Sequence, residues 1–271
     1  MGGSSVNSLS SAELNVTDFE SSLAVLRELK PVWVINCAAY TAVDSAEAEP
    51  ERAFAVNARG AGNLARAATE VGARFIHLST DYVFGESAVL EQALSEEHPC
   101  APMSIYGSTK LEGEKAVRSE CADSTIIRTA WVYTGPSRSR LELTGNDFVT
   151  TMLALEASRE TITVVDDQVG SPTFAHDLAA GLLQLTRTGA GAGTTMHAAG
   201  GGRASWFEVA RAVFAEIGAD PDRVKPCTTE DFSRPAPRPA YSVLSSAAWE
   251  RAGLPPLRDW REALGAAIAL G

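Results

Sequence analysis

The strongest constraint on the fold is an alternation of short apolar runs with longer segments of helical character. Runs at 32–35, 75–79 and 125–128 are short enough for strands and lack the regular polar alternation of a sheet with one wet face. The segments between them are long enough for helices. Strands separated by helices form parallel βαβ units. The sequence therefore predicts an α/β protein built on a doubly wound parallel sheet.

Local helix signals place the elements between these strands. Thr17 and Glu20 have the spacing of a capping box, which predicts a helix from about 18 to 30. Pro50 fits the first turn of an Ala-rich helix that continues to about Val71. Further helices are expected at about 106–119, 146–158 and 176–185, with strands at 161–165 and 195–198.

The pattern changes after Gly200. A Trp-bearing helix is expected at 205–217, followed by a proline-rich turn and two short helices, and we interpret this tail as a cap rather than as more sheet. The predicted division is a larger domain of 1–133 and 174–199 and a smaller C-terminal domain of 134–173 and 200–271.

Charge and composition exclude some classes of partner. Acidic side chains outnumber basic ones by 34 to 23, for a net charge of -11, which has the wrong sign for a nucleic-acid-binding surface. The sequence has neither an apolar stretch long enough to span a membrane nor a basic-then-apolar leader, so we expect a cytoplasmic enzyme. The four cysteines lack Cys-x-x-Cys spacing and are expected to be reduced and mostly buried, so no metal site is predicted.

Tyr106 and Lys110 form the best candidate for chemistry. They are four residues apart on a predicted helix, so both side chains leave one face about a turn apart. A neighbouring ammonium is expected to lower the pKa of the tyrosine, which then serves as a general acid towards a carbonyl oxygen. Chance gives roughly 0.07 such pairs in this composition, so the spacing alone is weak evidence. Thr80, at the carboxyl end of a predicted strand, is placed to donate to the same oxygen.

Ordered motifs along nearly the whole chain resemble one family. They are Asn36-Cys-Ala-Ala-Tyr-Thr-Ala-Val-Asp44, Ser79-Thr-Asp-Tyr-Val-Phe84, Tyr106-Gly-Ser-Thr-Lys110, Arg128-Thr-Ala-Trp-Val-Tyr133, Asp167-Gln-Val-Gly-Ser-Pro172, Ala204-Ser-Trp206 and Arg238-Pro-Ala-Tyr-Ser-Val-Leu244. These look like the dTDP-4-dehydrorhamnose reductases, extended short-chain dehydrogenases that complete dTDP-L-rhamnose synthesis. The resemblance implies a Rossmann-like sheet, with the larger domain binding the nucleotide cofactor and the smaller one binding the substrate.

The resemblance also implies roles for individual residues. Tyr106 would be the proton donor, Lys110 would hold the nicotinamide ribose and tune Tyr106, and Thr80 would polarise the C4 carbonyl of the sugar. The implied cofactor is NADPH or NADH. The other implied contacts are Ala39, Tyr40 and Thr41 to the cofactor, and Val43, Thr80, Asp81, Tyr82 and Trp131 to the dTDP-sugar. For Trp131 a place in the core, and for Val43 simple packing, are the competing interpretations.

Other functions remain open at this stage. Related sugar-nucleotide dehydratases usually have Thr-Asp-Glu where this chain has Thr80-Asp81-Tyr82, which makes dehydration or epimerisation less favoured than reduction. A non-catalytic binding protein is the alternative from another class, because the regulatory subunit of methionine adenosyltransferase resembles this family. Some members form dimers bridged by a divalent ion. A homodimer is thus possible, and a requirement for Mg is left undecided.

The glycine-rich turn of the family, between its first strand and first helix, is missing. None of the Gly-rich segments of this sequence lies between a strand and a helix in that way. Residues 13–18 look like the family's third strand region, so its first two strands have no counterpart here. We expect an exposed parallel edge in the sheet and weak or absent dinucleotide binding, and we hypothesise that Met1 is not the biological start.

Overall fold

The core of the computed structural model is a parallel sheet with strand order β1-β2-β3-β8. The structure describes residues 5–85, 92–140, 143 and 147–271. Asn36 pairs with His77 and Thr80 with Thr129, so neighbouring strands end at the same edge of the sheet. The strands are β1 (Trp33–Asn36), β2 (Arg74–Thr80), β3 (Thr125–Thr129) and β8 (Thr195–His197).

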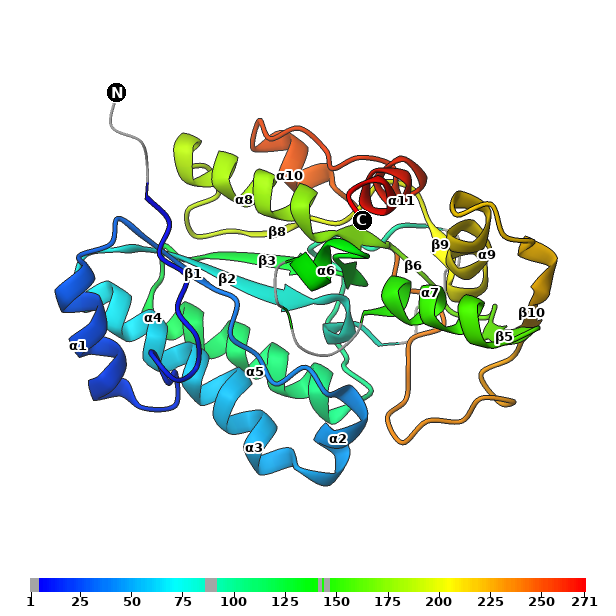
Figure 1. Cartoon of the computed structure of the whole chain (residues 1–271). Coiled ribbons are helices and arrows are strands. Elements are labelled where there is room, and N and C mark those ends of the chain that lie inside the picture. The colour runs from blue at the N-terminus through cyan, green and yellow to red at the C-terminus, as the bar shows by residue number, and fades with distance from the viewer. Residues whose placement is uncertain (1–4, 86–91, 141–142, 144–146) are drawn as a thin grey trace.

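Helices cover both faces of this sheet (Figure 1). Val34 and Phe75 pack against one helical layer, whereas the next residues, Ile35 and Ile76, pack against the other. This alternation follows from the pleat, because successive side chains of a strand point to opposite faces. The first layer contains α1 (Phe19–Leu29), α3 (Pro50–Phe54), α4 (Ala61–Glu70) and α5 (Ile105–Glu120), and the second contains α8 (Ala175–Thr188) and α10 (Ala247–Arg251). The predicted doubly wound architecture is confirmed.

The predicted helix from Pro50 to Val71 forms, with one irregularity. Between α3 and α4 the chain makes a π-helical segment, η1 (Ala55–Gly60), which widens the turn around Asn57. Isolated π turns inside α-helices are frequently found at functional sites. Here the wider turn places the Asn57 side chain against residues that follow β1.

Two predictions for the N-terminal region are wrong. The cap of α1 is Asp18, whose carboxylate accepts from the amide of Ser21 at 3.1 Å, whereas the hydroxyl of Thr17 donates to Asn15 instead of capping the helix. Residues 11–18 form turns rather than the strand region that the family resemblance suggested. Among the described residues β1 therefore has β2 as its sole strand partner and is an edge strand of the sheet.

A second hydrophobic core lies beside the sheet, at the right of Figure 1. It is formed by α7 (Phe148–Ser158), α9 (Trp206–Glu216) and α11 (Trp260–Ala269) around a separate two-stranded sheet of β5 (Ile162–Val165) and β10 (Val224–Cys227). Strand β10 was not predicted, and β5 does not extend the main sheet as the alternation suggested. Trp249 of α10 packs against the main sheet, in the cluster of Ile76 and Ile127, although it belongs to the segment 200–271 that was predicted to be part of the smaller domain.

Short elements complete the chain. They are α2 (Val43–Ala48), η2 (Asp81–Val83), β4 (Val132–Tyr133), α6 (Ser137–Arg140), β6 (Val169–Gly170), β7 (Thr173–Phe174), β9 (Ala204–Ser205) and η3 (Pro221–Arg223). Within the described ranges, no helix is long and apolar enough to cross a membrane. The cysteines are free, but they are not mostly buried as expected: Cys37 is exposed at the end of the edge strand and the other three are half-buried.

Candidate active site

Two chain segments meet at the carboxyl end of β2. Thr80 ends the strand, and its hydroxyl accepts from the amide of Tyr82, which turns the chain into η2. Helix α5 starts beside this turn because the Ser104 hydroxyl caps it, accepting from the Gly107 amide at 3.1 Å. The Glu47 carboxylate of α2 accepts from another free amide of the first turn, that of Ile105.

Two glycines of α5 bring this helix against neighbouring backbone. A Cβ on Gly107 would clash with the carbonyl oxygen of Tyr82, and one on Gly113 would clash with that of Asn57. Backbone oxygens cannot move aside as the end of a flexible side chain can. Any larger residue at these two positions would therefore push α5 away from η1 and η2.

The Tyr106 phenol is buried beside Thr80. The residue is 9 % exposed, and its ring meets the Tyr82 ring edge-on at 5.5 Å. Burial raises the pKa of Tyr106 to about 12, the nearby Thr80 hydroxyl lowers it and the Asp81 charge raises it. The expected lowering of the Tyr106 pKa by Lys110 is therefore absent from this structure.

Lys110 lies one turn further along α5 and points at the sheet. The residue is 2 % exposed, and its ammonium donates to the Leu78 carbonyl at 2.6 Å, which explains why it does not act on Tyr106 here. Burial lowers the pKa of Lys110 to about 8, while Glu114 and Cys37 oppose this change. The lysine is thus a buried cation near Cys37, the residue that follows β1.

Asp81 is buried between the end of β2 and the C-terminal segment around Ser242. Its Oδ1 accepts from the Thr80 hydroxyl at 3.0 Å and its Oδ2 from the Ser242 hydroxyl at 2.7 Å, and the residue is 1 % exposed. Burial raises its pKa to about 6, against the lowering effect of the Ser242 and Thr80 hydrogen bonds. Ser242 was not among the predicted site residues, because 161 positions separate it from Asp81.

A buried ion pair behind the site was also missed. Glu114 accepts from Arg128 through both oxygens, at 2.9 and 2.7 Å, and from the Ser79 hydroxyl at 2.5 Å. The Arg128 and Glu114 side chains are 6 % and 7 % exposed. Glu114 is four residues after Lys110, so a continuation of the Tyr106–Lys110 stripe could have pointed to it. This pair fastens α5 to β2 and β3.

The predicted cofactor-contacting residues follow β1. The amide and carbonyl of Tyr40 are both held by the Asn57 side chain, at 2.7 and 3.1 Å, and Asn57 also donates to Thr109 of α5. Ala39 is half-buried and Thr41 is exposed. Sequence reasoning missed Asn57, the residue that fixes this loop relative to α5.

Val43 and Trp131 pack in different hydrophobic clusters. Val43 packs against the cluster that contains Tyr106. Trp131 follows β3 with a positive φ of 48°, and its ring stacks on Trp206 with centroids 3.6 Å apart. A residue other than glycine is strained in this conformation, and such strain is often found at functional sites. The stacking equally fits the packing interpretation, so contact of either residue with substrate stays a prediction.

An ion pair connects the C-terminal segment to α2 across Tyr82. Arg238 donates to both oxygens of Asp44, at 2.5 and 2.9 Å, and lies close to the Tyr82 hydroxyl. The Arg238 hydrogen bond lowers the pKa of Asp44. The Arg238–Asp44 pair thereby fastens the C-terminal segment to α2.

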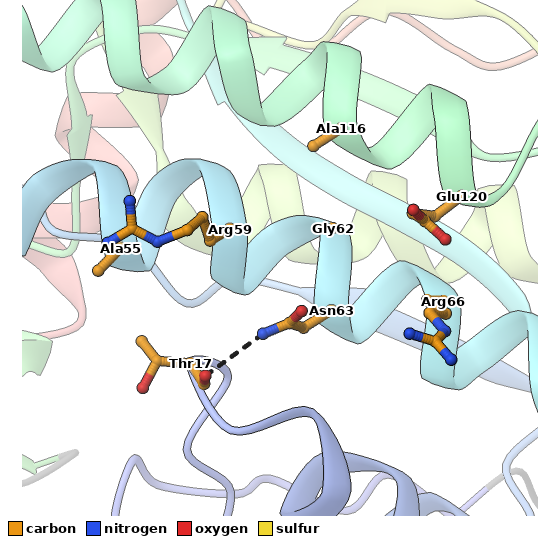
Figure 2. Close-up of a pocket in the computed structure, with 8 residues that line it drawn as sticks. All are labelled: Thr17, Ala55, Arg59, Gly62, Asn63, Arg66, Ala116 and Glu120. Atoms are coloured by element: carbon orange, nitrogen blue, oxygen red, sulfur yellow. Dashed lines mark hydrogen bonds between the residues drawn. The ribbon is translucent and has the colours of Figure 1, made fainter.

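A cavity of about 470 Å³ lies elsewhere, between α4, α5 and the loop of Thr17 (Figure 2). Its arginines pair with nearby carboxylates, Arg59 with Glu51 and Arg66 with Glu70, and its lining includes none of the predicted site residues. The buried, titratable groups at the strand ends are therefore the better candidate for chemistry.

This fold, with Thr80, Tyr106 and Lys110 gathered at the carboxyl ends of parallel strands, defines a short-chain dehydrogenase-like protein. The family model described as RmlD substrate binding domain matches residues 2–270, and the chain belongs to that family.

Named relatives agree with this assignment. A protein named dTDP-4-dehydrorhamnose reductase from Mycolicibacterium smegmatis is 50% identical over 268 residues, which cover 98% of this chain and 78% of the relative. A solved dTDP-4-dehydrorhamnose reductase from Bacillus anthracis, in complex with NADP, superposes with a TM-score of 0.89 at 36% identity, covering 97% of this chain and 89% of that one. One from Clostridium acetobutylicum has a TM-score of 0.87 at 40% identity, with 96% and 88% covered.

Proposed function

We propose that this protein reduces the C4 keto group of dTDP-4-dehydro-L-rhamnose to give dTDP-L-rhamnose. The observation that carries the proposal is the burial of Tyr106 beside Thr80 at the carboxyl end of β2, with Lys110 one turn further along α5. These are the residue types that carbonyl reduction needs, and the relatives with this family's name supply the substrate class. The absence of a glutamate at Tyr82 favours reduction over dehydration.

The chain's own residues would handle the proton and the carbonyl oxygen. A bound nicotinamide cofactor supplies the hydride that reaches C4 of the sugar. Tyr106 would donate its phenolic proton to the C4 oxygen, which becomes the 4-hydroxyl group, and Thr80 would hold that oxygen in place. A positive charge on Lys110 would stabilise the phenolate left on Tyr106.

The described residues fit the nicotinamide end of a dinucleotide cofactor. Lys110, Tyr106 and the loop of Ala39 and Tyr40, fixed by Asn57, offer a buried cation and a preset backbone for the nicotinamide ribose. For the pyrophosphate, the printed sequence has no glycine-rich turn between a strand and a helix. NADPH is our first choice of cofactor because the Bacillus anthracis relative is solved with NADP.

The test is a hydride-transfer assay on the full chain with dTDP-4-dehydro-L-rhamnose and saturating NADPH or NADH, with the sugar product identified by NMR. The proposal expects cofactor oxidation matched by dTDP-L-rhamnose. Tyr106→Phe is the matched control, because it keeps the ring and removes only the hydroxyl. Binding of the sugar nucleotide without cofactor oxidation would identify a binding protein instead. A product that retains a keto group would favour an epimerase or dehydratase.

A further inference from the structure

The Thr80 hydroxyl has one proton, and in this structure it donates that proton in a hydrogen bond to Asp81. Thr80 donates to Asp81 Oδ1 at 3.0 Å, and its oxygen accepts from the Tyr82 amide at 3.2 Å. The Tyr106 hydroxyl lies close enough to Thr80 for the two groups to influence each other. The Thr80 proton, however, is used inside the protein.

This arrangement is the wrong one for a carbonyl substrate. A keto oxygen can only accept hydrogen bonds, so it needs the protons of Thr80 and Tyr106 directed outward. While Asp81 is an acceptor, turning the Thr80 proton away would leave a buried carboxylate oxygen without its partner, at a cost of about 1–3 kcal/mol or more.

We propose that Asp81 is a positioning residue: when it takes up a proton it becomes a donor to Thr80, which frees the Thr80 proton to point at Tyr106 or the substrate oxygen. The step adds one solvent proton to the carboxylate and breaks no other covalent bond. Ser242 opposes it, since its hydroxyl donates to Asp81 Oδ2 and stabilises the charged form. This inference rests on the proposed function only for the identity of the substrate oxygen.

The surroundings of Asp81 favour a proton change under mild conditions. Burial disfavours the charge and raises the pKa of Asp81 to about 6. Tyr82 from the same turn and Tyr106 from α5 face it as neutral groups, because burial and, to a smaller extent, the Asp81 charge raise their pKa values. Ser242 faces it from the C-terminal segment, and Arg238 lies beyond Tyr82, paired with Asp44.

The test reads Tyr106 directly, without substrate or cofactor. The full chain is labelled with ¹³C at the ζ carbon of tyrosine, and the Tyr106 resonance, assigned with Tyr106→Phe, is followed against pH. We expect an inflection near pH 6. Asp81→Asn should abolish it. Ser242→Ala should move it upward by about one pH unit, because a lost hydrogen bond of about 1.4 kcal/mol destabilises the charged form.

A matched pair at position 80 separates the hydrogen-bond route from the through-space charge effect. Thr80→Ser keeps a hydroxyl and should keep the amplitude of the Tyr106 response, whereas Thr80→Val removes it and should reduce the amplitude by more than about half. A flat wild-type titration, an inflection that survives in Asp81→Asn, or equal amplitudes in the two Thr80 variants would each overturn the inference.

A second measurement connects the switch to turnover. If the chain reduces the keto sugar, wild-type kcat should increase as pH falls through about 6, and Asp81→Asn, whose amide donates to Thr80 at every pH, should lose this dependence. A uniform loss of kcat with an unchanged profile would mean a merely structural role. An inactive wild type would reject the proposed function, and the tyrosine titration would still decide the inference.

Discussion

Glu114→Gln should lower the free energy of unfolding by about 3 kcal/mol. The substitution keeps the shape of the side chain and removes its charge, so the buried Arg128 guanidinium loses its counter-ion. Breaking a buried pair by removing one partner typically costs 3–5 kcal/mol. The lower end applies because the Gln oxygen can still accept one of the two Arg128 bonds. For a chain of this size the melting temperature should fall by about 6–12 °C.

The assay is urea unfolding followed by circular dichroism, with calorimetry for the melting temperature. Glu112→Gln is the matched control on the same helix, because its partner Lys115 and Glu112 itself are 62% and 49% exposed. An exposed pair contributes about 0–1 kcal/mol, so this variant should be close to wild type. Arg128→Met added to Glu114→Gln should recover much of the stability, since no unpaired charge is left.

Equal losses for Glu114→Gln and Glu112→Gln would refute the reasoning, as would a double variant less stable than Glu114→Gln alone. A functional readout accompanies the stability measurement. The Glu114 charge raises the pKa of Lys110, so its removal should lower that pKa further and move any alkaline decline in activity to lower pH.

Two further outcomes are expected. Tyr106→Phe should reduce kcat for keto-sugar reduction by about 10²–10⁴-fold, the usual contribution of a general acid, with little change in binding of the sugar nucleotide measured by calorimetry. Activity should fall as pH rises through about 8, because Lys110 then loses its charge, and a Lys110→Met variant should not show this decline; a profile shared by both would contradict it.

The parallel sheet was predictable because its strands are short apolar runs and the helices between them have local start signals, such as Pro50 at the start of α3. Strand β10 was not predictable, because Pro226 lies inside its four residues and proline argues against a strand. The cap of α1 was misassigned because Thr17 and Asp18 are both good capping residues, and only the bond of Thr17 to Asn15 decides between them.

The site was predictable where its residues are close in sequence. Tyr106 and Lys110 are related by a helix turn, which local spacing reveals. Ser242 meets Asp81 and Arg238 meets Asp44 only after the C-terminal segment has folded back over the sheet, 161 and 194 positions away. The pKa of Tyr106 was mispredicted for a related reason, because nothing in the sequence shows that the Lys110 ammonium turns to the Leu78 carbonyl.

The two glycines of α5 have a consequence for how such a site can diversify. At Gly107 and Gly113 the helix touches main chain, so the spacing between the Tyr106 and Thr80 backbones does not depend on side chains that mutation could exchange. The residues predicted to line the sugar, such as Val43 and Trp131, come from other segments. Selection for a new deoxysugar could therefore replace the lining piece by piece and leave the reacting groups in register.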